Sequence, residues 1–132
     1  MQDFYCEHVL EHFKYPSNYG ALDHPTVSHE EHNPLCGDRI RLDLLIENDI
    51  VKDIRFSGQG CVISQASASI LTDEIKGKTV EAAKLFGKAE LLEQIGIPLE
   101  KSPVRLKCAL LSLKALKVCL YGVADILEEE WS

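Results

Sequence analysis

The 132-residue sequence lacks long hydrophobic runs, an excess of positive charge and any C-x-x-C motif. No stretch of roughly 18 uncharged apolar residues occurs, and no basic segment precedes an apolar one near the N-terminus, so neither a membrane span nor a secretory leader is expected. Fourteen Lys and Arg stand against 21 Asp and Glu, a formal charge of -7. That charge disfavours nucleic acid and anionic membranes as partners. We therefore expect a soluble, cytoplasmic protein.

The overall composition is that of an ordinary globular domain. Hydrophobic residues make up 45% of the chain and charged residues 27%, values typical of folded proteins and unlike those of disordered chains. No linker, repeat or low-complexity segment divides the sequence. Residues 1–132 are accordingly predicted to form a single domain.

Hydrophobic periodicity predicts a small antiparallel sheet between helical segments. Apolar residues recur at helical spacing over 3–15, whereas apolar and polar residues alternate over 39–46 and again over 50–56. The turn-forming residues between the last two segments predict a hairpin. Residues 58–63 are expected to add a short third strand, and residues 16–34, rich in Pro and His, to form an irregular loop.

The second half of the chain is predicted to be helical. Ser64 and Thr79 are suitable N-caps for helices over 65–75 and 80–86. A short segment over 90–95 precedes one long helix over about 104–129, whose apolar residues follow the 3.6-residue period. This order predicts an α+β domain with about three antiparallel strands and helices packed on one face of the sheet.

Five cysteines lie at positions 6, 36, 61, 108 and 119. Their odd number and the expected reducing compartment disfavour a disulfide framework. Cys6 and Cys119 each lie within an apolar helical stripe, where a free thiol usually packs as a small hydrophobe. Cys108 begins its predicted helix beside Lys107 and Arg105. Positive charge and a helix N-terminus both favour the thiolate there.

Three cysteines and one carboxylate occur where the chain enters or leaves regular structure. Cys36 and Asp38 lie in a turn, Cys61 precedes a helix, and Cys108 begins another. Thiolates with a carboxylate suit tetrahedral zinc or an iron–sulfur cluster. Spacing alone leaves open the alternative that these cysteines are simply buried.

Three motifs resemble those of the U-type iron–sulfur scaffold family, which comprises IscU, SufU and the amino-terminal domain of NifU. They are Asn-Pro-Leu-Cys-Gly-Asp at 33–38, Gly-Cys-Val-Ile-Ser-Gln-Ala-Ser-Ala-Ser-Ile-Leu-Thr at 60–72 and Arg-Leu-Lys-Cys-Ala at 105–109. The segments 5–13 and 16–20 also resemble the start of that family. The resemblance therefore extends over nearly the whole chain.

The resemblance implies a SufE/NifU-like fold and a specific set of ligands. Cys36, Asp38, Cys61 and Cys108 would bind iron, zinc or a [2Fe-2S] cluster, with Asp38 as the labile ligand. Cys36 and Cys108 are candidate persulfide acceptors, and Lys107 would stabilise the thiolate form of Cys108. The implied function is a scaffold that takes sulfur from a cysteine desulfurase and passes clusters to apo iron–sulfur proteins or carrier proteins.

Two departures from the family patterns bear on the branch of the family. Lys107 occupies the position where Isc-type scaffolds carry His, as in SufU-like members, yet the interval from Cys61 to Cys108 is short for the insertion that SufU-like members carry. Isc-type proteins recruit an Hsp70-type chaperone through Leu-Pro-Pro-Val-Lys. This chain has Lys-Ser-Pro-Val-Arg at 101–105, which leaves use of that chaperone an open question.

Three alternatives to the scaffold remain at this stage. A zinc-dependent sulfur acceptor would relay persulfide from the desulfurase to another scaffold, so that sulfurtransferase activity could accompany a protein that is otherwise not an enzyme. A zinc-stabilised interaction module would use the metal only for folding, although such closed sites rarely include Asp. His8 and His12 fit the H-x-x-E-H spacing of inverted zinc peptidases, but the chain is short for a peptidase.

Overall fold

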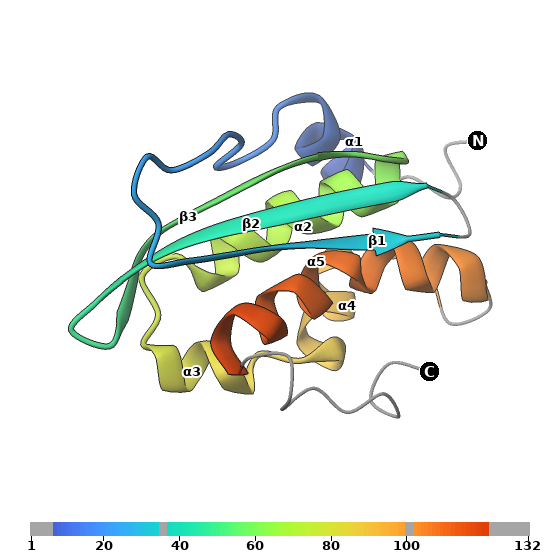
Figure 1. Cartoon of the computed structure of the whole chain (residues 1–132). Helices are drawn as coiled ribbons and strands as arrows, with labels where there is room; N and C mark the ends of the chain where they lie inside the picture. Colours follow the sequence, from blue (N-terminus) through green and yellow to red (C-terminus); the bar gives the residue numbers. More distant parts are fainter. Residues whose placement is uncertain (1–6, 35–36, 100–101, 122–132) are drawn as a thin grey trace.

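A three-stranded antiparallel sheet is covered by helices in the computed structural model, which describes residues 7–34, 37–99 and 102–121 (Figure 1). The elements are α1 (Glu7–Lys14), β1 (Val27–Asn33), β2 (Asp38–Glu47), β3 (Ile50–Gln59), α2 (Val62–Ile75), α3 (Val80–Leu85), α4 (Lys88–Ile95) and α5 (Pro103–Tyr121). The predicted α+β class is confirmed. In the described part of the chain, no helix is long and apolar enough to cross a membrane.

The core lies between one face of the sheet and helices α2 and α5. The strands are ordered β1-β2-β3, and Leu42 of β2 pairs with Phe56 of β3, as Leu44 does with Ile54. These four side chains have no exposed surface. Helix α5 contacts β1 and β2, while α2 contacts β2 and β3, and α1 packs mainly on α2. The prediction that helices cover one face of the sheet is thus confirmed.

The prediction of an irregular loop over 16–34 was wrong for its second part, where residues 27–33 form strand β1. The strand pairs with β2 in a continuous antiparallel register from Val27 opposite Leu44 to Asn33 opposite Asp38. Its sequence contains two Glu and two His and lacks apolar alternation. Backbone pairing at the sheet edge, rather than a buried apolar face, stabilises this strand, which explains why its periodicity is weak.

The prediction of a separate short strand over 58–63 was also wrong. Strand β3 itself continues to Gln59, and helix α2 begins at Val62. At Gly58, φ is +144° and an added Cβ would lie 2.0 Å from the Arg39 carbonyl oxygen. Only glycine allows the two strands to approach so closely there. The N-cap of α2 is Cys61, not Ser64. The N-cap predicted at Thr79 is confirmed, since its side chain accepts the Ala82 N–H at 3.1 Å.

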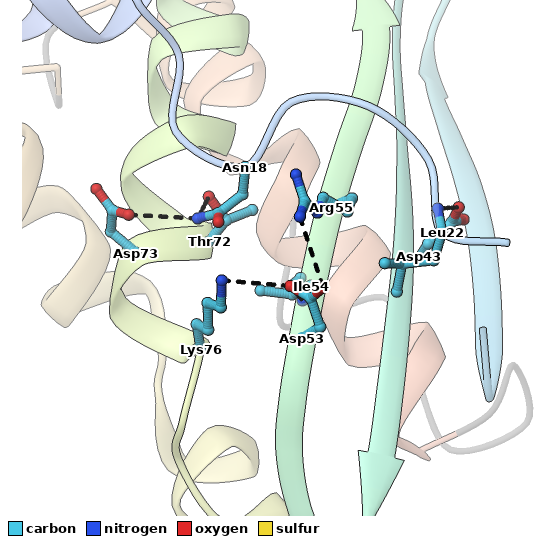
Figure 2. A network of polar contacts seen from close by, with 9 residues as sticks. All are labelled: Asn18, Leu22, Asp43, Asp53, Ile54, Arg55, Thr72, Asp73 and Lys76. Carbon is cyan, nitrogen blue, oxygen red and sulfur yellow. Dashed lines mark hydrogen bonds and ion pairs between the residues drawn. The ribbon is translucent and has the colours of Figure 1, made fainter. Parts of the chain in front are cut away.

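The segment between α1 and β1 joins α2 to strands β3 and β2 (Figure 2). The Asn18 carbonyl and the Gly20 N–H bond to the two backbone groups of Phe56, while the Asn18 amide donates to Asp73 and Thr72. Farther along, the Leu22 N–H donates to Asp43 at 3.0 Å. These contacts hold the segment after α1 against α2, β3 and β2, although the segment has no regular secondary structure.

Helix α5 begins at Pro103, close to the position predicted from the sequence. The part of the predicted helix beyond Tyr121 lies outside the described residues. Within α5, Cys108, Ala109, Leu113 and Leu116 are buried. The first turns of this long helix bring Cys108 beside Asp38 and Cys61.

Candidate metal centre

Asp38, Cys61 and Cys108 converge from three separate elements. Asp38 is the first residue of β2, Cys61 is the N-cap of α2, and Cys108 lies in the second turn of α5. One ligand atom from each lies within 4.8 Å of the other two. Among the described His, Cys, Asp and Glu residues, no other such group of three forms. The structure therefore brings together three of the four predicted ligands.

The Asp38 carboxylate is held at the N-terminus of α2. Its Oδ1 accepts the Cys61 backbone N–H at 3.3 Å, and its Oδ2 lies 3.6 Å from Cys61 Sγ. The residue is only 2% exposed. A carboxylate is favoured at this position because the first N–H groups of a helix lack partners within the helix.

Gly60 allows the carboxylate to approach α2. A Cβ at this position would lie 2.7 Å from Asp38 Cγ and 2.6 Å from Ser64 Oγ, distances at which atoms overlap. Its φ of +157° is also in the region that favours glycine. A side chain at Gly60 would therefore collide with Asp38 and Ser64, so glycine is required there. The sequence alone does not reveal this reason.

Cys61 is the exposed member of the group, and its thiol is strongly activated. Its pKa is lowered to about 6, chiefly by a hydrogen bond with Cys108 and further by hydrogen bonds with Ser64. Burial and the negative charge of Asp38 act in the opposite direction and raise the pKa, but their effect is smaller. Ser64 Oγ lies 3.8 Å from Cys61 Sγ. Cys61 is therefore a thiolate at neutral pH, which is the form that binds metal and attacks sulfur.

Cys108 is buried, with 3% of its surface exposed. The side-chain amide of Asn33, at the end of β1, donates to Cys108 Sγ at 3.9 Å. Lys107 is exposed and, with Asn33, lines a cavity of about 140 Å³. The other lining residues are His32, Pro34, Leu110, Leu111 and Lys114. The predicted effect of Lys107 on the Cys108 thiolate stays a prediction.

Cys36 and Cys6 lie outside the described residues, so their predicted roles stay predictions. On either side of residues 35–36, Asn33 pairs with Asp38, and the Gly37 N–H donates to the Asn33 carbonyl at 2.8 Å. Cys36 therefore belongs, in sequence, to the connection that ends at Asp38.

Cys119 packs against the hydrophobic core, as its position in an apolar stripe predicts. Burial, with a smaller effect from Asp43, raises its pKa to about 12. A thiol with so high a pKa stays protonated at neutral pH and is a poor metal ligand. The high pKa of Cys119 agrees with the prediction that Cys108, and not Cys119, is the cysteine of α5 that belongs to the site.

His8 and His12 form a packing contact on α1, with ring centroids 4.8 Å apart. His12 Nδ1 lies 2.7 Å from Ser69 Oγ on α2. His12 thus connects two helices, and no third ligand joins the pair within the part of the chain that the structure describes. The arrangement gives no support to the zinc peptidase alternative.

The donor set fits a thiophilic metal. Two thiolates favour zinc, or iron as part of an iron–sulfur cluster, whereas a carboxylate oxygen is a harder ligand that such centres hold less firmly. The exposed Cys61 leaves one side of the group open to solvent. A site of this kind can bind a metal and also release it.

The comparisons with known proteins agree with this site. A family model described as the NifU-like N-terminal domain matches residues 4–126. The zinc-dependent sulfurtransferase SufU of Bacillus subtilis is 40% identical, over 89% of each chain. The iron–sulfur cluster assembly scaffold protein IscU of Thermotoga maritima is 36% identical, over 91% of this chain and 94% of that one.

A solved structure shows the same fold. The SUF-system scaffold protein FiSufU of Fervidobacterium islandicum superposes with a TM-score of 0.80 at 27% identity, covering 90% of this chain and 98% of that one. The alignments to the SufU and IscU relatives each run over 136 residues, more than the 132 of this chain. Both relatives therefore contain residues that have no counterpart in this chain. Because this holds for the SufU and the IscU relative alike, these extra residues do not show which of the two this chain resembles more.

Proposed function

Because this chain belongs to the NifU-like N-terminal domain family, we propose that it is a scaffold for iron–sulfur cluster assembly. The observation that carries the proposal is the convergence of Asp38, Cys61 and Cys108 within 4.8 Å. Cys36, which precedes Asp38 by two residues, is the proposed fourth ligand. The cluster is the cargo of this site, and iron and sulfide are its substrates.

Sulfur would arrive as a persulfide on a cysteine desulfurase. A thiolate of this chain attacks the terminal sulfur, the sulfur–sulfur bond of the donor breaks, and the desulfurase cysteine leaves as a thiolate. The new sulfur–sulfur bond joins the attacking cysteine of this chain to the transferred sulfur, and no oxidant is consumed. Cys61 is exposed and ionised at neutral pH, so it joins Cys36 and Cys108 as a candidate first acceptor.

Release of the cargo depends on a ligand that binds less firmly than a thiolate. Asp38 supplies an oxygen ligand, and its carboxylate accepts a hydrogen bond from the Cys61 N–H. The oxygen can return to that hydrogen bond as the metal leaves. Apo iron–sulfur proteins or carrier proteins are the proposed recipients.

Anaerobic reconstitution tests the scaffold proposal. The chain is incubated with ferrous iron, cysteine, a cysteine desulfurase and dithiothreitol, which reduces each transferred sulfur to sulfide. Visible absorption of a cluster, with iron and sulfide in equal amounts, is the expected result. Cys61→Ser should lose the absorption, and Cys119→Ser, outside the site, should keep it. Absence of a cluster under every condition would overturn the proposal.

A zinc-dependent sulfur relay is the second candidate, favoured by the 40% identity to a zinc-dependent sulfurtransferase and by Lys107. In that case zinc is bound by the same thiolates and orders them, while the protein passes on persulfide without building a cluster. Asp38, Cys61 and Cys108 fit tetrahedral zinc as three of its four ligands.

Lys107→Ala distinguishes the two candidates. In a relay that depends on the positive charge, the variant should take up persulfide several-fold more slowly while retaining zinc. In a scaffold it should still assemble a cluster. Persulfide is measured by mass spectrometry after brief incubation with desulfurase and cysteine. Lys114→Ala is the matched control, because Lys114 lines the same cavity two helical turns farther along α5.

A further inference from the structure

Asn33 connects two parts of the site that are far apart in sequence. It is the last residue of β1 and is 6% exposed, and its Nδ2 donates to Cys108 Sγ on α5. Its carbonyl accepts the Gly37 N–H, and it pairs with Asp38 across the hairpin. The backbone of Asn33 thus closes the connection before Asp38, while its side chain reaches the buried thiol.

A neutral amide is well suited to this position. Cys108 is buried, so its ionisation on metal binding is costly unless a donor compensates for the lost water. The Asn side chain supplies two N–H donors and has no proton to lose near neutral pH. An N–H bond to sulfur orients the thiolate and reduces the electron density that it gives to a metal.

Ser64 makes a comparable but more local contact with Cys61. Its hydroxyl donates to the Cys61 carbonyl at 3.2 Å and also lies 3.8 Å from Cys61 Sγ. Both groups belong to the start of α2, so the local helix geometry already places them together. The Asn33 contact instead spans from β1 to α5, and it therefore contributes to the relative placement of two ligand-bearing segments.

We propose that Asn33 is a positioning residue, which holds the Cys108 sulfur toward Asp38 and Cys61 and tunes its strength as a metal ligand. The metal-tuning part of this role rests on the proposed function. The contact itself can be measured without metal, sulfur or desulfurase, so its test does not depend on that function.

The first experiment tests the contact in the metal-free chain by NMR of side-chain amides. Cys108→Ala removes the sulfur acceptor and leaves Asn33 in place, so the Asn33 amide resonances should shift and exchange faster with solvent. The Asn48 amide, in the exposed turn at the other end of the sheet, should not change. Unchanged Asn33 resonances would overturn the proposal, whatever the outcome of cluster reconstitution.

The second experiment tests the effect on a bound metal. In Asn33→Leu, which is similar in size and has no donor, the sulfur-to-cobalt charge-transfer band of the Co²⁺ form should move to longer wavelength. Zinc affinity should fall about 10-fold, because the Cys108 sulfur is no longer held toward the other ligands. Asn33→Gln, which keeps the amide, should restore part of both. The exposed Gln94→Leu on α4 is the control for loss of an amide.

A purely structural role would lower stability without moving the charge-transfer band. An unchanged band in a folded Asn33→Leu protein would therefore overturn the proposal. Should that variant fail to fold, Asn33→Gln and the Cys108→Ala resonance experiment decide the question. Failure of the scaffold proposal would appear separately, as wild-type protein without cluster but with the Asn33 contact intact.

Discussion

The reactivity of the cysteines differs because their surroundings differ. Cys61 is exposed at a helix N-terminus and shares a hydrogen bond with Cys108, whereas Cys119 is packed against the core. The same functional group thus has a pKa of about 6 at one position and of about 12 at the other. Position in the fold, rather than residue type, determines which thiols take part in chemistry.

Alkylation of the metal-free chain checks this difference. Iodoacetamide reacts with the thiolate, so modification of Cys61 should be half-maximal near pH 6 and should increase above that pH, while Cys119 should not react at neutral pH. Peptide mass spectrometry across a pH series measures both. Cys108→Ala should raise the midpoint, because the hydrogen bond with Cys108 is the main cause of the low pKa. A wild-type midpoint near 9.0, the ordinary thiol value, would contradict the prediction.

At the scale of the secondary-structure elements, the ligands lie at the ends of elements rather than in their middles. Asp38 begins β2, Cys61 caps α2, and Cys108 is in the second turn of α5. Ends of elements have free backbone donors and can be brought together by the packing of the elements behind them. The helices and the sheet thus form a rigid support for a site that is open on one side.

Helix α5 offers a direct comparison of a site cysteine with a packing cysteine. Cys108 and Cys119 lie about 16 Å apart along the helix, at about 1.5 Å per residue. Cys108→Ser should weaken zinc binding at least about 10-fold. Cys119→Ser should leave the affinity unchanged and lower the free energy of unfolding by about 1 kcal/mol.

Competition with a chromophoric chelator measures the affinities, and urea unfolding measures the stabilities. Equal zinc affinity in wild type and Cys108→Ser would remove Cys108 from the site. Loss of affinity in Cys119→Ser would contradict its assignment to the core.

Sequence patterns predict the hairpin β2–β3 and helix α5 well because both have buried apolar faces with clear periodicity. They fail for β1, whose polar edge is held by backbone pairing, and for 58–63, where the chain finishes β3 at Gln59 and begins α2 at Val62 instead of adding a strand. Geometry brings Asp38, Cys61 and Cys108 together, whereas spacing only suggests it. The roles of Asn33 and Gly60 depend on contacts across the fold, which no local pattern contains.

At the scale of the whole molecule, a buried charge stabilises the sheet. Asp43 is 2% exposed and accepts hydrogen bonds from Ser28, from Arg41 and from the Leu22 N–H, at 2.7, 2.9 and 3.0 Å. Burial alone would raise the pKa of Asp43, but these three hydrogen bonds outweigh it and the pKa is lowered. The carboxylate joins β1, β2 and the segment before β1.

This lowered pKa predicts how stability depends on pH. The ionised Asp43 stabilises the folded chain above its ordinary pKa of 3.8, and this contribution is lost as the pH falls through the lower folded value. Asp43→Asn should cost about 2 kcal/mol at neutral pH. It should also show a smaller loss of stability on acidification, so that the two curves converge at low pH.

Urea unfolding over a pH series measures both proteins, with Asp49→Asn as control. Asp49 is exposed in the β2–β3 turn at φ +63°, a conformation that Asn also tolerates. A constant difference between wild type and Asp43→Asn at all pH values would contradict the prediction.

The convergence of ligands from β2, α2 and α5 also has a thermodynamic consequence. A metal or cluster bound there acts as a cross-link between segments 23 and 47 residues apart in sequence, as counted from Asp38 to Cys61 and from Cys61 to Cys108. Cargo that binds only the folded chain stabilises it by RT ln(1 + [L]/Kd). The loaded chain would therefore be the more heat-resistant form, and under the proposed scaffold function each delivery of cargo would return the protein to its less stable state.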